Sequence, residues 1–190
     1  SGAISLWDHT GTEQPQLYES SLSNNLSEPI VLNMDDDPEK EIIAVEGSVS
    51  GDGFLYAWNL DGTAVEGNWP VNVGGSYDPP VAGDVDGDGQ LEIVINAGNG
   101  LYVLDTSGSV QFYKHSFGAF DTIGSGMPAL ADLNGDGVLE IILAVENITD
   151  ISGVLVFTGN GAAFAQWPYV FDYVNAAWLS GAVVADVDTD

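Results

Sequence analysis

The sequence predicts an all-β protein, a β-propeller-like array of four-stranded antiparallel blades. Three observations support this fold class. An acidic loop recurs about every 50 residues, a strand-and-turn segment recurs in step with it, and no stretch keeps the 3.6-residue period of an amphipathic helix. Four short strands per unit of about 50 residues are typical of a propeller blade.

The acidic loops share one spacing. The segment 84–95 reads DVDGDGQLEIVI and the segment 132–143 reads DLNGDGVLEIIL, so acidic or amide side chains occupy alternate positions before an apolar run begins. Related loops start at Asn33 and Asp186, and a short apolar segment precedes each of them. The runs EIVINA and EIILAV are rich in β-branched residues, too short for helices and bounded by turn residues, so we expect strands.

The second landmark is an alternating apolar strand followed by a glycine turn. It occurs as ISLWDHTGT (4–12), LYAWNLDGT (55–63), LYVLDTSGS (101–109) and VLVFTGNGA (154–162). Each unit therefore reads as strand, acidic loop, strand, loop, strand, glycine turn, strand. A β-sandwich does not repeat its sequence in step, and a doubly wound α/β fold needs helices between its strands.

The phase of the repeat predicts one incomplete propeller over residues 1–190, with about three and a half to four repeats. The loop at Asp186 lacks the strand that should follow, and closure on itself would leave an unpaired edge, which proteins normally cover. We expect the remainder of a longer chain or neighbouring subunits to complete the open edges; a compact four-bladed ring is the alternative. The predicted parts are the second half of a blade (1–22), three blades (27–75, 76–122 and 123–175) and the start of a further blade (176–190).

Composition and charge exclude several classes of partner. The chain has 190 residues, 45% of them hydrophobic, with 5 Trp, 7 Tyr and 7 Phe, so we expect a folded domain. Its 29 acidic residues face two lysines and no arginine, which gives a net charge of −27. Nucleic acids and anionic membranes require basic residues, and no run reaches the roughly 18 apolar residues of a membrane span. Without cysteine, no disulfide or thiolate metal site is available.

The two full acidic loops are predicted to bind calcium. Carboxylates held about 4 Å apart repel by about 4 kcal/mol per pair at an effective dielectric constant near 20, and a bridging cation removes this repulsion. Hard oxygen ligands without nearby His or Cys select Ca²⁺ over zinc or copper, and Mg²⁺ demands stricter octahedral geometry. Gly89 and Gly137 supply the sharp turn in each loop. The predicted ligands are Asp84, Asp86, Asp88, the Gln90 carbonyl and Glu92 in one loop, and Asp132, Asn134, Asp136, the Val138 carbonyl and Glu140 in the other.

Two further loops match less well and bring the expected total to at most four ions. One keeps the spacing, but Pro38 replaces the turn glycine and cannot adopt a positive φ. The other binds only if the chain continues. The candidate ligands are Asn33, Asp35, Asp37, Glu39 and Glu41 in the first of these loops, and Asp186, Asp188 and Asp190 in the second.

An EF-hand is excluded as the source of this pattern. EF-hand loops also begin D-x-[DN]-x-D-G, but they require a closing acid at position twelve and flanking helices. Position twelve here is Ile95 or Leu143, and both flanks are predicted strands.

The pattern D-x-[DN]-G-D-G-x-x-[DE] after a short apolar strand resembles the FG-GAP repeats of integrin α-subunit propellers and the related VCBS-type repeats of secreted bacterial proteins. The resemblance covers essentially the whole chain, and the 84–92 and 132–140 loops are its specific part. It implies a propeller of about seven blades. It also implies Ca²⁺ in the hairpin between the first and second strands of a blade, held by the first, third, fifth and ninth loop residues and the seventh carbonyl. Here Glu replaces the commoner Asp at the ninth position, and Pro38 departs from the pattern.

The sequence predicts no catalytic site. His9 lies at a turn and His115 in a variable segment, and neither neighbours a recognisable Ser or Asp motif. The recurrence of the acidic groups favours metal ligation over the single acid and nucleophile of a glycosidase. We therefore expect a non-enzymatic, calcium-stabilised module of a secreted or cell-surface protein, which serves adhesion, recognition or assembly with a protein or glycan ligand.

Two alternatives stay open from the sequence. The chain is either a non-catalytic propeller or carbohydrate-binding part of a secreted carbohydrate-active enzyme, or a subunit of an extracellular filament in which neighbouring subunits complete each other's blades. The tryptophans mostly occupy repeat-equivalent places, which favours packing between blades over sugar stacking.

Overall fold

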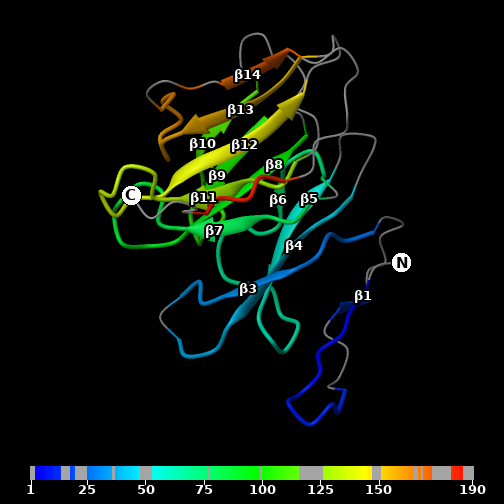
Figure 1. Cartoon of the computed structure of the whole chain (residues 1–190). Coiled ribbons are helices and arrows are strands. Elements are labelled where there is room, and N and C mark those ends of the chain that lie inside the picture. The colour runs from blue at the N-terminus through cyan, green and yellow to red at the C-terminus, as the bar shows by residue number, and fades with distance from the viewer. Residues whose placement is uncertain are drawn as a thin grey trace.

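The computed structural model shows an all-β, antiparallel architecture (Figure 1). It describes residues 3–13, 18–19, 25–35, 37–47, 53–76, 78–98, 100–115, 126–146, 151–164, 167, 169–172 and 181–185. In this part of the chain the strands form three four-stranded sheets and one two-stranded sheet, and no helix is long and apolar enough to cross a membrane. The all-β, antiparallel class expected from the sequence is confirmed.

Each four-stranded sheet uses four strands that are consecutive in the chain and are arranged in chain order across the sheet. The first sheet contains β3 (Ile30–Leu32), β4 (Glu41–Val45), β5 (Phe54–Trp58) and β6 (Val71–Asn72). The second contains β7 (Val81–Gly83), β8 (Glu92–Ala97), β9 (Gly100–Leu104) and β10 (Val110–Lys114). The third contains β11 (Ala129–Ala131), β12 (Glu140–Glu146), β13 (Ile151–Phe157) and β14 (Tyr169–Asp172). The two-stranded sheet pairs β1 (Ala3–Ile4) with β2 (Tyr18–Glu19).

The acidic loops connect the first and second strands of the three large sheets. In each sheet the ladder ends where the residue before the loop pairs with the ninth residue of the loop. These pairs are Leu32 with Glu41, Gly83 with Glu92, and Ala131 with Glu140. The loop therefore begins and ends on one rung of a sheet, which holds its two ends together.

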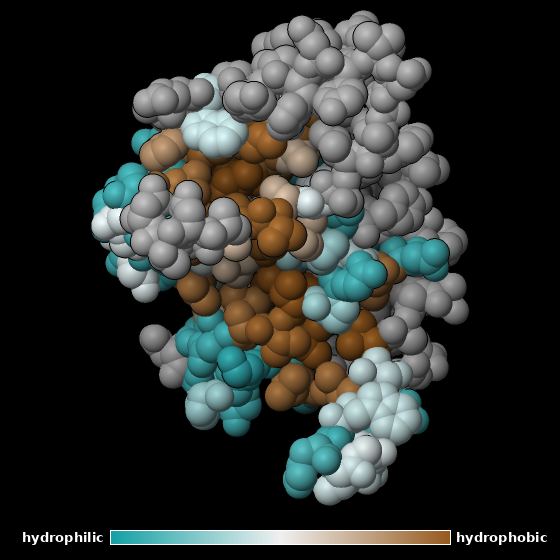
Figure 2. Space-filling view, in the orientation of Figure 1, coloured by the Kyte–Doolittle hydropathy of each residue, from teal (hydrophilic) through white to brown (hydrophobic). Residues whose placement is uncertain are grey.

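The large sheets stack face to face, and the second lies between the other two. From β8, Ile93 and Ile95 join a buried cluster with the first sheet, whereas Val94 joins a cluster with the third sheet. A strand that is covered on both faces needs apolar side chains on both, which explains why EIVINA is a nearly continuous apolar run and not an alternating one. The outer face of the first sheet packs in part against Ile4 and Leu6, and Figure 2 shows hydrophobic residues gathered over β3 and β4.

Polar contacts join the first and second sheets near the glycine turn between β9 and β10. The Asn68 backbone N–H donates to the Ser107 carbonyl at 2.7 Å, and the Trp69 indole N–H donates to the Thr106 carbonyl at 3.2 Å. The Trp69 ring lies against Gly108, where an added Cβ would be only 3.1 Å from the ring. Trp69 therefore packs between two sheets.

The second and third sheets also meet closely. The Lys114 ammonium lies 5.5 Å from the centre of the Phe157 ring, within the range of a cation–π contact. Nearby, a Cβ placed on Gly159 would lie 2.1 Å from the Val85 carbonyl oxygen. The backbone of the third sheet's glycine turn therefore touches the acidic loop of the second sheet, at a place where only glycine fits.

The Gly159→Ala variant tests this packing. Its methyl group meets backbone atoms that cannot rotate away, so we expect the free energy of unfolding to fall by about 1–3 kcal/mol, as for overpacked sites. Urea unfolding measures the loss. Gly126→Ala is the matched control, because its Cβ would lie 3.1 Å from the Ala144 carbonyl oxygen and needs only a small shift. Equal losses in the two variants would contradict the close approach at Gly159.

Candidate metal centre

The three described acidic loops lie along the same side of the molecule, on the left of the view in Figure 1. They follow β3, β7 and β11, the first strands of the three sheets. Two of them bring three carboxylates together: Asp84, Asp86 and Asp88 in one loop, and Asp35, Asp37 and Glu41 in another, with ligand atoms within 4.8 Å of one another. The candidate metal centre therefore recurs at equivalent places.

In the 84–92 loop the carboxylates are held by the loop's own backbone. Asp84 accepts the N–H groups of Gly87 at 2.7 Å and Gly89 at 3.0 Å, and Asp86 accepts the Asp88 N–H at 3.1 Å. Gly87 and Gly89 have φ values of 82° and 86°, in the left-handed region that favours glycine. The predicted turn role of Gly89 is thus accompanied by a second such turn at Gly87.

The ninth residue of each loop is a buried glutamate with one fixed oxygen. Glu41, Glu92 and Glu140 are 0%, 4% and 2% exposed. In each, Oε2 accepts the backbone N–H of the loop's second residue, namely Met34 at 2.5 Å, Val85 at 2.9 Å and Leu133 at 2.8 Å. The longer glutamate side chain reaches across the loop to this N–H, and in Glu41 the second oxygen has no hydrogen-bond partner.

Burial and neighbouring charge make Glu41 and Glu92 unfavourable positions for an uncompensated negative charge. Desolvation raises the pKa of Glu92, and the carboxylates of Asp86 and Asp88 raise it further. Desolvation also raises the pKa of Glu41, with an additional contribution from Asp35 and Asp37. A divalent cation would relieve both causes, because it supplies the opposite charge within the cluster.

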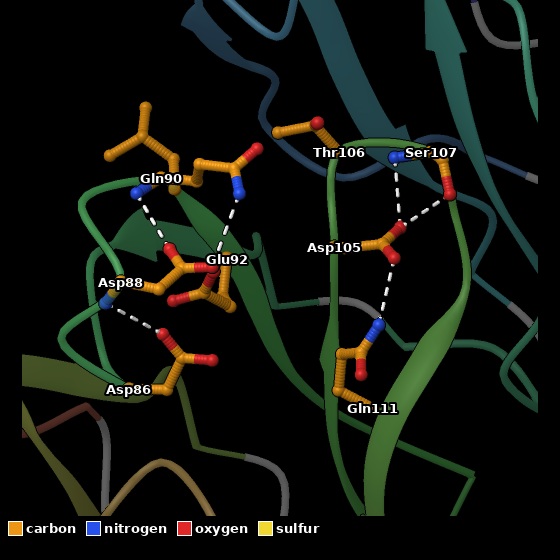
Figure 3. Close-up of a pocket in the computed structure, with 9 residues that line it drawn as sticks. Asp86, Asp88, Gln90, Glu92, Asp105, Thr106, Ser107 and Gln111 are labelled. Atoms are coloured by element: carbon orange, nitrogen blue, oxygen red, sulfur yellow. Dashed lines mark hydrogen bonds between the residues drawn. The ribbon is translucent and has the colours of Figure 1, made fainter.

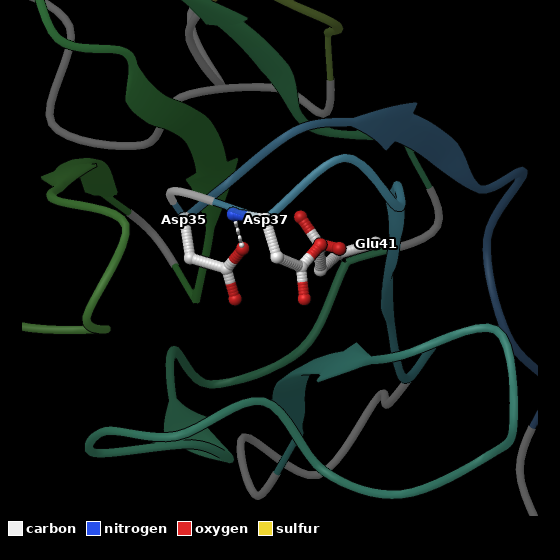
Figure 4. A group of neighbouring side chains, drawn as sticks. All are labelled: Asp35, Asp37 and Glu41. Atoms are coloured by element: carbon white, nitrogen blue, oxygen red, sulfur yellow. Dashed lines mark hydrogen bonds between the residues drawn. The ribbon is translucent and has the colours of Figure 1, made fainter.

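The 33–41 loop contains the clearest indication of an oxygen ligand for a cation. Glu41 Oε1 is buried and has no hydrogen-bond partner. Figure 4 shows the Glu41 carboxylate beside Asp37, with Asp35 next in line. A buried, unpaired carboxylate oxygen is costly unless a cation or donor meets it. Pro38 does not prevent the three carboxylates from gathering.

The 132–140 loop has the same frame with an amide at its third position. Asp132 accepts the N–H groups of Gly135 at 2.7 Å and Gly137 at 2.8 Å. The bond from Gly137 is the main cause that lowers the pKa of Asp132, and the bond from Gly135 also lowers it. The Asn134 amide donates to Asp136 at 2.9 Å and to Glu140 Oε1 at 3.4 Å. The Asn134 amide thus bridges the carboxylates of Asp136 and Glu140.

The remaining predicted ligand residues donate hydrogen bonds within their own loops through nitrogen atoms, and not through the oxygens predicted as ligands. The Asn33 amide donates to the Asp37 carbonyl at 2.6 Å, and the exposed Glu39 donates its backbone N–H to Asp37 at 2.8 Å. The Gln90 amide donates to Asp88 at 3.1 Å, and the Val138 N–H donates to Asp136 at 2.9 Å. Three predicted ligands lie outside the described residues: Asp186, Asp188 and Asp190.

A polar pocket of about 310 Å³ opens between the 84–92 loop and the β9–β10 turn. Figure 3 shows Asp86, Asp88 and Glu92 on one side and Asp105 on the other. Burial raises the pKa of Asp105, but hydrogen bonds from Ser107, Ser109 and Gln111 outweigh it and lower the pKa below its ordinary value. The pocket gives solvent and solutes a path to the loop.

Sequence reasoning missed the N–H groups of Met34, Val85 and Leu133, which hold the buried glutamates. Backbone donors carry no signature of their own. The available signal was the acid at the ninth position, since an acid that opens a buried strand needs a partner. His9 and His115 are both exposed, as expected for turn residues.

Comparisons with known proteins add a structural neighbour. The chain is similar to the crystal structure of the V. cholerae biofilm matrix protein Bap1, with a TM-score of 0.51 and 25% sequence identity. The similarity covers 77% of this chain and 31% of the Bap1 chain, so it concerns a part of that protein. No model of a known protein family and no curated protein matches the chain.

Substitution of Glu92 separates its structural role from its charge. In calcium-free buffer, Glu92→Gln keeps an oxygen for the Val85 N–H and removes a buried charge, so we expect stability equal to or above that of the parent. Glu92→Ala leaves that N–H unpaired and should lose about 1–3 kcal/mol. Urea unfolding in the presence of a chelator makes the measurement. Equal destabilisation by both substitutions would contradict this division of roles.

Proposed function

We propose that this chain is a calcium-stabilised, non-catalytic module of an extracellular protein that acts in adhesion or assembly. The similarity to the biofilm matrix protein Bap1 supports an extracellular adhesion or assembly role. The recurrent carboxylate clusters support a metal-binding role. The observation that carries the calcium assignment is Glu41 Oε1, a buried carboxylate oxygen without a partner beside two further carboxylates.

The proposal includes a specific fold. The three large sheets are consecutive blades of a β-propeller of the FG-GAP or VCBS type. Their shared strand order, their face-to-face stacking and the placement of the acidic loops on one side support this arrangement. The first strands β7 and β11 also lie close together, as neighbouring inner strands of a propeller do. Further blades, from a longer chain or from neighbouring subunits, complete the ring.

The proposed calcium ligands are oxygen atoms of the loops. In the 84–92 loop they are the carboxylates of Asp84, Asp86, Asp88 and Glu92 and the Gln90 carbonyl, and the 132–140 loop uses the equivalent positions. The 33–41 loop is the third proposed site, in spite of Pro38. When bound, calcium neutralises the crowded charge and ties a loop to the first rung of its sheet. An all-oxygen, flexible loop of this kind suits Ca²⁺ better than Mg²⁺.

Removal of calcium is expected to lower the melting temperature strongly. A site with free calcium at about 100 times its dissociation constant adds about 2.7 kcal/mol, and 1 kcal/mol shifts the melting temperature of a domain of this size by about 2–4 °C. The three proposed sites, at this occupancy, therefore predict a drop of about 16–32 °C on addition of EDTA. Differential scanning calorimetry tests this, and an unchanged melt after chelation would refute the stabilising role.

Single substitutions should reproduce part of the EDTA effect. Asp86→Asn is expected to reduce the calcium-dependent gain in melting temperature by about a third if the three sites contribute equally. Asp61→Asn is the matched control, because Asp61 is an exposed aspartate in the β5–β6 turn that accepts hydrogen bonds from Thr63. If the two variants lose the same calcium response, the 84–92 loop is not the site.

Assembly and ligand binding need separate measurements. We expect light scattering to show larger particles with calcium than with EDTA if subunits complete each other's blades, as the similarity to a matrix protein suggests. A glycan array probed with and without calcium tests the carbohydrate-binding alternative. A protein that stays monomeric and binds no glycan in calcium would contradict the assembly and glycan-binding roles, while the calcium-dependent melt would remain a separate result.

A further inference from the structure

We infer that the 84–92 and 132–140 loops bind calcium cooperatively, so that filling one loop raises the affinity of the other. The inference rests on the proposed function, because it concerns two of the proposed calcium sites. It is carried by direct contacts between these loops, which belong to neighbouring sheets.

A backbone hydrogen bond links the two loops. The Leu139 N–H donates to the Asp84 carbonyl at 3.1 Å. Asp84 is the first proposed ligand of its loop, and Leu139 lies between two proposed ligands of the other, Val138 and Glu140. The same bond therefore positions the backbone of both sites.

Side chains reinforce this link at two places. A Cβ placed on Gly87, between the ligands of the first loop, would lie 2.9 Å from Val138 Cγ2. A Cβ on Gly83 would lie 2.6 Å from Leu139 Cδ1, so the Leu139 side chain covers the residue that precedes Asp84. The two loops cannot shift independently without breaking these contacts.

The contacts set the sign of the coupling. Calcium in one loop fixes the backbone that the other loop must also fix, so the second ion pays a smaller ordering cost. Electrostatics act in the opposite direction, because a filled loop attracts the second ion less. Salt at 0.15 M screens this electrostatic effect with a Debye length of about 8 Å, whereas it does not weaken the direct contacts between the loops. We therefore expect positive coupling of about fivefold, at the lower end of the usual range for coupled sites.

The 33–41 loop supplies an internal comparison. In the described part of the chain, no backbone hydrogen bond joins this loop to the 84–92 or the 132–140 loop. Its calcium affinity should therefore depend on theirs less than the affinities of the 84–92 and 132–140 loops depend on each other.

The experiment titrates calcium into chelator-stripped protein by calorimetry at about 0.15 M salt. Three substitutions remove the carboxylate at the fifth position of one loop: Asp37→Asn, Asp88→Asn and Asp136→Asn. Asp136→Asn should lower the calcium affinity of the 84–92 loop about fivefold. Asp88→Asn should lower the calcium affinity of the 132–140 loop by the same factor, because coupling is reciprocal. Asp37→Asn, the matched control, should change both affinities much less than fivefold.

A second pair of variants tests the contact itself. Leu139→Ala keeps every proposed ligand and its own N–H but removes the side-chain contact with Gly83, so the coupling should fall below fivefold without being lost. Leu91 lies at the equivalent place in the 84–92 loop but packs against the first sheet. The Leu91→Ala variant should therefore retain the coupling. Circular dichroism in calcium-free buffer checks that each variant is folded, and Asn134→Ala replaces Asp136→Asn if that variant does not fold.

The outcomes distinguish the inference from the proposed function. Calcium binding in both loops with affinities that do not respond to substitution of the other loop would overturn the coupling and leave the proposed function intact. A response to Asp37→Asn as large as the response to Asp136→Asn would also overturn it, because the effect would not follow the contacts. Absence of calcium binding in all loops would overturn the proposed function as well.

Discussion

The hydrogen bond from the second residue of each acidic loop to the buried glutamate at its ninth position is the interaction on which the sites depend. It joins the top of the loop to the first rung of the sheet, where Glu41, Glu92 and Glu140 pair with the residues that precede the loops. Without this bond, repulsion between the carboxylates would oppose the closed conformation of the loop. Because the glutamates are buried, the bond also forms where water does not compete.

This arrangement couples the loops to the packing of the whole molecule. The glutamate opens the second strand of its sheet, and that strand supplies the most buried residues, such as Ile93 and Ile141. The second strands stack from sheet to sheet through two clusters, so the position of each loop is set by the core beneath it. The contacts of Val85 with Gly159 and of Asp84 with Leu139 then join a loop to the next sheet. The geometry of each loop therefore depends on how the sheets stack.

Much of this could be predicted from the sequence, because repeated spacing reports repeated structure. The strands that follow the acidic loops, the hairpins with glycine turns and the gathering of Asp84, Asp86 and Asp88 all follow from local patterns. Contacts between different sheets could not be predicted, since the N–H of Leu139 and the carbonyl of Asp84 have no side-chain signature. In the 33–41 loop, the local sequence was a poor guide for a related reason. Pro38 argued against a site there, but the buried Glu41 still meets Asp35 and Asp37, because the sheet and not the turn residue places it.

The net charge of −27 gives these loops a further consequence. Each loop holds like charges close together, and burial of Glu41 and Glu92 adds a desolvation cost that raises their pKa values. In the absence of cations these costs act against the folded state, since self-repulsion destabilises a compact chain of high net charge. Under the proposed function, the carboxylates that destabilise the folded state without cations become the calcium ligands that close each loop. Because those loops also touch neighbouring sheets, the stability that calcium adds would extend from the individual loop to the stacking of the sheets.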